Sequence, residues 1–359
     1  MSRVRYVLLS LFVVAAIAIA GGLVSPASAS KTDTRMTVMT YNVCSRYGTC
    51  IKSHDQRLVK QAELVIAEKP DVIGFQEFMD PGSHLSKTLR AAGYVNTAVG
   101  HQKIYVNTAT FEVVQTCSYW DRLVDPRDAD YQPELDDAFE VIDGTSEPGD
   151  MLFWEGRIWR LKPFDPGRLD HNREIGYDLH NLQCEAVGAT IDMSVFRKKA
   201  YNANWTIVTS KKTGKSFFVV SAHTIAKIGK TYDRERARQV TSLIRQVKKA
   251  NTESLPVVYL GDFNSGSHFS YDGPGKVFRK TGFVDSFTRA RKKVRSSYDT
   301  FNGFELKPRR NGYQIDHVYV TPKVKVLRWE NVIRLSGKKY ARPLPSDHNP
   351  VKVTLSIPS

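Results

Sequence analysis

The chain has 359 residues, of which 41% are hydrophobic and 25% are charged. This composition excludes a disordered chain and a membrane protein with many spans, and the length suits one large α/β domain or two smaller ones. Lysine and arginine outnumber aspartate and glutamate by 52 to 37, so the formal net charge is +15, which indicates an anionic partner such as nucleic acid or an acidic lipid surface.

The first 29 residues have the pattern of a secretory signal peptide. Arg3 and Arg5 precede an apolar run over residues 6–24, and the small residues 27–29 (Ala-Ser-Ala) form a cleavage signature. The run also approaches the length of a membrane span, so an uncleaved anchor is the alternative. We predict cleavage near Ala29 and secretion of residues 30–359 as a monomer.

All four cysteines lie in the predicted mature chain, where an exported protein usually forms disulfides. Four cysteines allow three pairings, and the sequence does not decide rigorously between them. Cys44 with Cys50 would close a short loop and leave Cys117 to pair with Cys184. A zinc site is the weaker alternative, because no C-x-x-C spacing or nearby histidine supports it.

Strand and helix patterns alternate along the chain. A helix is predicted to begin at a Ser53–Gln56 capping box and to end before Pro70, and a second helix over residues 85–92 is predicted to end at Gly93. The later part of the chain predicts one more helix, over residues 234–249. Strands are predicted at residues 36–42, 72–75, 217–221, 256–260, 315–320 and 351–357. This alternation predicts an α/β sandwich with mixed sheets.

Residues 121–150 differ from the rest of the chain, with eleven acidic residues against two basic ones. A solvated surface insertion is the simpler interpretation. A structural Ca²⁺ site is the alternative, since this cation prefers carboxylate and carbonyl oxygens, although no EF-hand spacing is present.

Six segments share one design, in which an apolar strand runs directly into residues that bind metals or transfer protons. They are Tyr41-Asn42, Gln76-Glu77, 221–224 (Ser-Ala-His-Thr), 261–264 (Gly-Asp-Phe-Asn), 315–317 (Ile-Asp-His) and 346–350 (Ser-Asp-His-Asn-Pro). Strand ends of an α/β sheet converge on one crevice, so these residues are expected to meet. The oxygen-rich set suits Mg²⁺ or Mn²⁺ and leaves histidine for proton transfer or phosphate contact.

In this order, the segments TYN, GFQE, SAHT, GDFNS, QIDHVYV and SDHNPV resemble the motif series of the endonuclease/exonuclease/phosphatase superfamily. The resemblance implies an α/β fold: a four-layer α/β sandwich, two mixed β-sheets packed face to face with helices outside. It also implies metal-dependent hydrolysis of a phosphoester. The series extends from Asn42 to Pro350, so a single catalytic domain would fill residues 30–359.

The resemblance further assigns roles to individual residues. Glu77 would hold the divalent cation, helped by Asn42 and Asp347, and the cation would neutralise phosphate charge. His348 would act together with a carboxylate that orients its ring, and the general base stays unassigned. The catalytic set, which also positions water and phosphate, would be His223, Asp262, Asn264, Asp316 and His348.

Two further residues near the motifs receive an interpretation. Glu147 resembles the glutamate that supports the histidine of the SAHT segment, and Asp143 and Asp150 are alternatives to it. His317 follows Asp316 on the same strand and should face the opposite side, so we interpret it as a packed core histidine.

The core motifs leave the substrate open, and the surrounding sequence has to indicate it. Residues 289–295 carry five basic side chains in seven positions, and such a cluster would attract a phosphate backbone in a salt-dependent way. The alternative is a merely solvated charge run. Aromatic residues such as Trp205 would stack on bases or else belong to the core. The predicted substrate-binding residues are Arg291, Lys292, Lys293 and Arg295.

The leading hypothesis is a secreted nuclease acting on DNA or RNA. A secreted sphingomyelinase or phospholipase C-like enzyme, acting on membrane lipid, is the alternative, and a non-catalytic nucleic-acid-binding protein is a third hypothesis from a different class. Inositol polyphosphate phosphatases usually have a Trp-Cys-Asp-Arg motif where this chain has Gln-Ile-Asp-His at 314–317, which argues against that branch.

Overall fold

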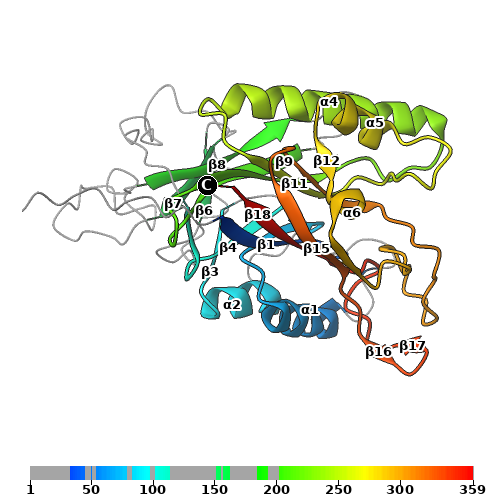
Figure 1. Ribbon diagram of the computed structural model, residues 1–359. Coiled ribbons are helices and arrows are strands. Elements are labelled where there is room, and N and C mark those ends of the chain that lie inside the picture. The colour runs from blue at the N-terminus through cyan, green and yellow to red at the C-terminus, as the bar shows by residue number, and fades with distance from the viewer. Residues whose placement is uncertain are drawn as a thin grey trace, which may run out of the picture. The chain divides into compact units, whose positions relative to one another are not determined.

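The computed structural model describes residues 33–44, 50, 54–78, 83–97, 102–113, 151–154, 157–161, 184–192 and 202–358. Two mixed β-sheets account for most of this part of the chain (Figure 1). None of the described helices is long and apolar enough to cross a membrane. The predicted signal peptide and the acidic segment 121–150 lie outside the described residues.

The first sheet is built around the N-terminal strand β1. This strand pairs in parallel with β2 and antiparallel with the last strand, β18, so segments from the two ends of the chain lie side by side. In sheet order, its seven strands are β13 (Lys292–Val294), β15 (Lys325–Asn331), β18 (Val351–Ile357), β1 (Thr34–Asn42), β2 (Val72–Gln76), β4 (Ile104–Asn107) and β3 (Tyr94–Asn96).

The second sheet is likewise mixed, with β10 and β11 parallel and their outer neighbours antiparallel. In order, its strands are β12 (Val284–Asp285), β14 (Asp316–Val320), β11 (Val257–Asp262), β10 (Ser216–His223), β9 (Asn202–Ser210), β8 (Cys184–Asp192), β7 (Arg157–Leu161) and β6 (Met151–Trp154), while β5 (Phe111–Val113) also pairs with β9. A separate hairpin consists of β16 (Leu335–Ser336) and β17 (Lys339–Tyr340).

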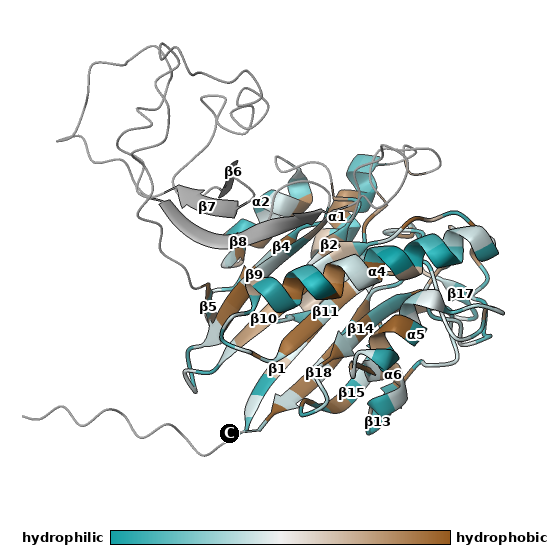
Figure 2. Cartoon of the chain, turned by 90° about the horizontal axis from the view of Figure 1, so that it is seen from above, coloured by the Kyte–Doolittle hydropathy of each residue, from teal (hydrophilic) through white to brown (hydrophobic). Residues whose placement is uncertain are grey.

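Helices cover the outer face of each sheet. Helices α1 (His54–Glu68) and α2 (His84–Ala91) lie on the first sheet, and α4 (Lys230–Ala250) and α5 (Gly273–Lys280) lie on the second (Figure 1). Figure 2 shows α4 as mostly hydrophilic where it lies over the hydrophobic strands β10 and β11. A one-turn helix, α6 (Ser286–Arg289), follows β12.

The alternation of side chains along β1 explains the layers. Met36 and Val38 point into the core between the sheets, whereas Met39 and Tyr41 pack under α1 and α2. Successive residues of a strand face opposite sides, so a strand that is apolar on both faces needs a layer on each side. The four-layer α/β sandwich predicted from the motif series is therefore confirmed.

The predicted elements are present with small shifts in their ends. The helix expected after residue 53 is present and buries Leu58, Ala62 and Val65, although its proposed cap at Ser53 lies outside the described residues. Strand 351–357 has the expected bounds. Several elements were not predicted from the sequence, among them β3 to β5, β8, β9, β15 and α5, and most of these are short or lack a clear hydrophobic period.

Candidate active site

Strand ends from both sheets meet at one edge of the sandwich. Asn42 ends β1 and Glu77 follows β2, its parallel neighbour. His223 and Asp262 end the parallel strands β10 and β11 in matching register, and Asp316, at the start of antiparallel β14, pairs with Asp262. The predicted convergence of the motifs is thus what the topology produces.

Asn42 joins the two sheets. Its Nδ2 donates to Glu77 Oε1 at 3.0 Å and to Asp262 Oδ2 at 3.1 Å. Its Oδ1 accepts the backbone N–H of Cys44 at 2.9 Å. Asn42 therefore offers the carboxylates a donor that holds them together, while its amide oxygen, the atom that would bind a cation, is turned to the backbone.

His348 and Asp316 form a buried pair. Nδ1 of His348 lies 3.0 and 3.1 Å from the two Asp316 carboxylate oxygens, and both side chains are almost fully buried. Burial opposes protonation, but the negative charges of Asp316 and Asp262 and the hydrogen bond to Asp316 outweigh it and raise the pKa of His348 to about 10. Asp316 thus fixes the ring orientation and favours the imidazolium.

Asp262 lies between two histidines. Its Oδ2 is 3.6 Å from Nε2 of His348 and 3.6 Å from Nε2 of His223, and its Oδ1 accepts the backbone N–H of Asn264. The Asn264 side chain donates to Thr224 O, which ties the loops after β10 and β11 together. Nε2 of His223 is buried without a hydrogen-bond partner among the described residues, and the carboxylate oxygens of Asp262 and Glu77 lie 3.6 and 3.9 Å from it.

The acidic side of the cluster has the properties of a cation site. Burial raises the pKa of Asp347 above its ordinary value, and the charges of Glu77 and Asp262 add to this effect while His348 opposes it. Mutual destabilisation of neighbouring carboxylates is relieved when a divalent cation binds them, so these residues fit an oxygen-liganded metal. Glu77 also has a φ of 55°, a backbone strain that is typical of functional positions.

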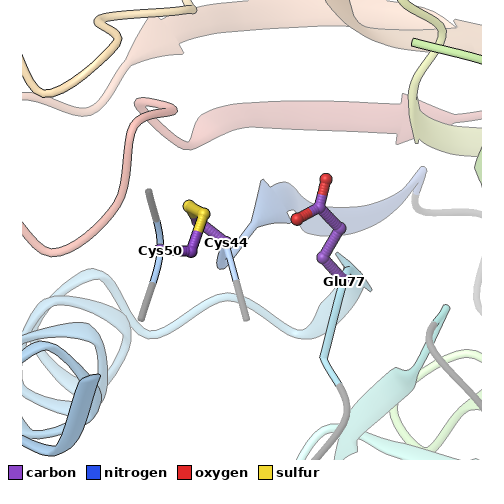
Figure 3. Close-up of side chains that lie close together, drawn as sticks. All are labelled: Cys44, Cys50 and Glu77. Atoms are coloured by element: carbon purple, nitrogen blue, oxygen red, sulfur yellow. A yellow bond between two sulfur atoms is a disulfide. The ribbon is translucent and has the colours of Figure 1, made fainter. Parts of the chain in front are cut away.

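The disulfide between Cys44 and Cys50 is present, which confirms this half of the predicted pairing. Figure 3 shows it beside Glu77, and the sulfur and carboxylate atoms of the three residues lie within 4.8 Å of one another. Because both sulfurs are oxidised, the set is not a thiolate metal site. For the other predicted pair, Cys117 lies outside the described residues and only the backbone of Cys184 is described.

Two buried polar residues of α1, both missed in the sequence, hold the loops that carry the site. Arg57 donates to Cys44 O at 2.9 Å, to Cys50 O, and to Pro345 O at 3.3 Å. One turn later, Gln61 donates to Pro345 O at 2.8 Å and to Val43 O. The loop after β1 and the loop before His348 are therefore fixed to one helix.

The predicted substrate-binding residues do not lie among the histidines and carboxylates described above. Lys292 and Lys293 belong to the edge strand β13, and β15 and β18 stand between β13 and β1. Trp205 is half-buried, stacks on Phe218 and packs against the hydrophobic cluster that includes residues of α4, which favours the core alternative for this residue. Glu147, with its alternatives Asp143 and Asp150, lies outside the described residues.

His317 is the packed histidine predicted from its position. Its Nδ1 lies 2.9 Å from Asp285 Oδ2, and its Nε2 lies 2.9 Å from Ser265 O and 3.2 Å from Gln314 O. It therefore connects the loops that carry Asn264 and Asp316 from the side opposite the active site.

A two-sheet sandwich with an acidic cluster and a buried His–Asp pair at one edge is the architecture of a phosphoester-hydrolysing enzyme. A family model described as "Endonuclease/Exonuclease/phosphatase family" matches residues 39–348, and the chain belongs to this family. Its members are hydrolases of phosphoester bonds and generally depend on a divalent metal. No curated protein matches the sequence.

Solved structures share the fold at low sequence identity. An endonuclease/exonuclease/phosphatase family protein of Bacteroides thetaiotaomicron is 20% identical, with a TM-score of 0.59 and coverage of 90% of this chain and 98% of that one. A mannosyl-6-phosphatase of the same organism is 20% identical, with a TM-score of 0.57 and coverage of 89% and 99%. TDP2 of D. rerio, complexed with a single-strand DNA product, is 13% identical, with a TM-score of 0.51 and coverage of 90% and 99%.

Proposed function

We propose that this chain is a secreted, divalent-metal-dependent nuclease that hydrolyses phosphodiester bonds of DNA or RNA. The observation that carries the chemistry is the buried His348–Asp316 pair, which lies against Asp262 and faces the carboxylates of Glu77 and Asp347. Nearby donors and acceptors of this kind supply general acid–base catalysis and stabilise charge that develops on phosphate oxygens.

Each residue of the cluster has a role under this proposal. Asp262 orients the attacking water, because its Oδ2 faces the space between the two histidines. His348, held as an imidazolium by Asp316, stabilises the negative charge of the transition state. His223 donates from its unpartnered Nε2 to a phosphoryl oxygen, and Asn42 keeps Glu77 and Asp262 in place.

Glu77 and Asp347 would hold the metal, with Mg²⁺ or Mn²⁺ the ions that suit carboxylate oxygens. When bound, the ion supplies charge neutralisation at the phosphate and at the leaving oxygen. The Oδ1 atom of Asn42 accepts Cys44 N–H with one lone pair, so its second lone pair is the one that would reach a cation.

The charge of the chain favours nucleic acid over a small phosphoester. Without Arg3 and Arg5 of the predicted signal peptide, the net charge is still +13, which raises the local concentration of a polyanion and is unnecessary for a neutral or zwitterionic substrate. TDP2, which shares the fold, is complexed with a single-strand DNA product, and this supports a nucleic acid as the substrate of this chain. A mannosyl-6-phosphatase also shares the fold, so a phosphomonoester is the alternative substrate.

The test is cleavage by the mature protein with Mg²⁺, Mn²⁺ or EDTA. Supercoiled plasmid and single-stranded RNA represent the proposed substrates, while sphingomyelin vesicles and a sugar phosphomonoester represent the others. Glu77→Gln should abolish metal-dependent nicking, and Glu253→Gln, which alters an exposed carboxylate outside the cluster, should retain it. If the wild-type protein hydrolyses only sphingomyelin or only the monoester, the nuclease proposal is refuted, whereas hydrolysis of phosphoester bonds, the chemistry of the family, stands.

Secretion is a separate part of the proposal and needs its own measurement. Expression of the full chain followed by N-terminal sequencing of the protein in the medium should yield a chain that begins just after Ala29. Retention of the full-length chain in the membrane fraction would favour the uncleaved anchor instead.

A further inference from the structure

Exposed aromatic rings gather next to the catalytic pair. Among the described residues, five large hydrophobic side chains are exposed, and three of them are the aromatic residues Phe269 (38%), Phe301 (40%) and Tyr313 (45%). The half-buried ring of His268 stacks on Tyr313, with centroids 4.2 Å apart and planes 8° apart, and contacts Phe269 at 4.1 Å. We call His268, Phe269, Phe301 and Tyr313 the aromatic rim.

Backbone hydrogen bonds place this rim beside the reacting residues. Phe301 forms a β-bridge with His348, and their rings are 5.0 Å apart. Thr300 N donates to Tyr313 O at 2.9 Å, and Thr300 O accepts from Asn349 N at 2.7 Å. The extended segment that contains Thr300 and Phe301 therefore lies between the backbone around Tyr313 and the backbone around His348.

The rim is held by buried polar groups, so its rings are in place before substrate arrives. The carboxylate of Asp299 accepts the backbone N–H groups of Asn311 and Tyr313 at 3.1 and 3.0 Å. A Cβ on Gly266 would lie 2.0 Å from Gln314 O, so only glycine allows the loop of His268 to approach the segment of Tyr313 this closely.

We propose that the aromatic rim is a stacking site for a nucleobase of the substrate, next to the phosphate that is cleaved. The exposed part of each ring faces solvent in the free protein and can gain a base–aromatic stacking contact when a strand binds. This inference rests on the proposed nuclease function and identifies the nucleobase as the part of the substrate that this site binds.

The charge around the rim favours a base of a nucleic acid over the cationic headgroup of a choline lipid. The loop over residues 305–313 carries Lys307, Arg309 and Arg310 against the single acidic residue Glu305. A quaternary ammonium would be repelled by this loop, while the phosphates that flank a stacked base would be attracted.

The experiment compares two substrates that share a phosphate backbone. One is a short oligothymidylate and the other is an oligomer of the same length in which every residue is abasic. Tyr313→Ala should lower the ratio of kcat/KM for the first to kcat/KM for the second by about 10-fold, the order of one lost stacking contact. Tyr313→Phe should restore the ratio, because the ring rather than the hydroxyl group makes the contact.

Leu335→Ala is the matched control, since Leu335 is exposed to a similar extent but lies on the separate hairpin β16–β17. In a second measurement, an oligonucleotide with 2-aminopurine should lose fluorescence on binding to His348→Ala protein, and less when Phe269→Ala is added. If the wild-type protein cleaves oligothymidylate and Tyr313→Ala leaves the ratio of the two kcat/KM values unchanged, the stacking site is overturned while the nuclease function stands. A wild-type protein that cleaves no nucleic acid would overturn the proposed function.

Discussion

Replacing Asp285 with asparagine should destabilise the protein by about 3 kcal/mol near pH 5.5 and by far less near pH 10. The reason is the environment of His317, in which both ring nitrogens face only acceptors: the Asp285 carboxylate at Nδ1 and the Ser265 and Gln314 carbonyls at Nε2. Neutral imidazole has one N–H, so only the imidazolium satisfies both sides.

The magnitude follows from the pKa of this histidine. Burial opposes its charge, but the charge of Asp285 and the hydrogen bond to it raise the pKa of His317 to about 9, against about 6.5 in an unfolded chain. At 1.36 kcal/mol per pKa unit, the difference corresponds to about 3 kcal/mol. Because the folded pKa is raised, this stability is fully present below pH ~6.5 and is lost as the pH rises toward ~9.

Asparagine is the appropriate replacement because Asp285 also caps α6, where its Oδ1 accepts Phe287 N–H at 2.8 Å. Asn is as good a cap as Asp, so the substitution removes the charge and retains the cap. Urea unfolding of both proteins across this pH range gives the difference in unfolding free energy, in which other titrating groups cancel. A difference that stays constant with pH would refute a charged His317.

Three shorter predictions follow from the site and the core. His348→Ala should lower kcat by about 10²–10⁴-fold while nucleic-acid binding by fluorescence anisotropy persists, because the residue acts on the chemical step. Gly74→Ala should cost about 1–3 kcal/mol in urea unfolding, since its Cβ would lie 2.8 Å from Leu260 Cβ between the sheets. Neutralising the four basic residues within 291–295 should reduce the salt slope of binding by up to about 4; an unchanged slope would exclude contact with phosphate.

The sequence predicted that these residues meet because Asn42, Glu77, His223 and Asp262 end or directly follow an apolar strand. Asp316 and His348 instead start or precede theirs. In β10 and β11, His223 and Asp262 stand at the carboxyl ends of parallel neighbours, and that placement depends only on strand pairing. The same logic placed His317 on the face opposite Asp316, since successive strand residues alternate sides.

The environments of Trp205 and Tyr313 could not be predicted from the pattern of strands. Trp205 is half-buried because it packs against a cluster that includes residues of α4, an element more than twenty residues later in the chain, so neighbouring charges did not indicate its packing. Tyr313 is exposed because Asp299 and Thr300, more than ten residues earlier in the chain, accept and donate the hydrogen bonds of its backbone. Loop conformations fixed by such distant bonds leave no local pattern in the sequence.

Arg57 and Gln61 are a different case, because their signal was present in the helix pattern. They lie one turn apart on the face of α1 that also carries Leu58, Ala62 and Val65, and a polar pair on a buried face needs acceptors. The acceptors are carbonyls of the loops around the active site, among them Cys44 O and Pro345 O. Since Ser346 Oγ donates to Asn42 O at 2.7 Å, these bonds fix the loop of Asp347 and His348 against the end of β1. The geometry of the candidate active site is therefore maintained by the packing of α1 as well as by the sheets.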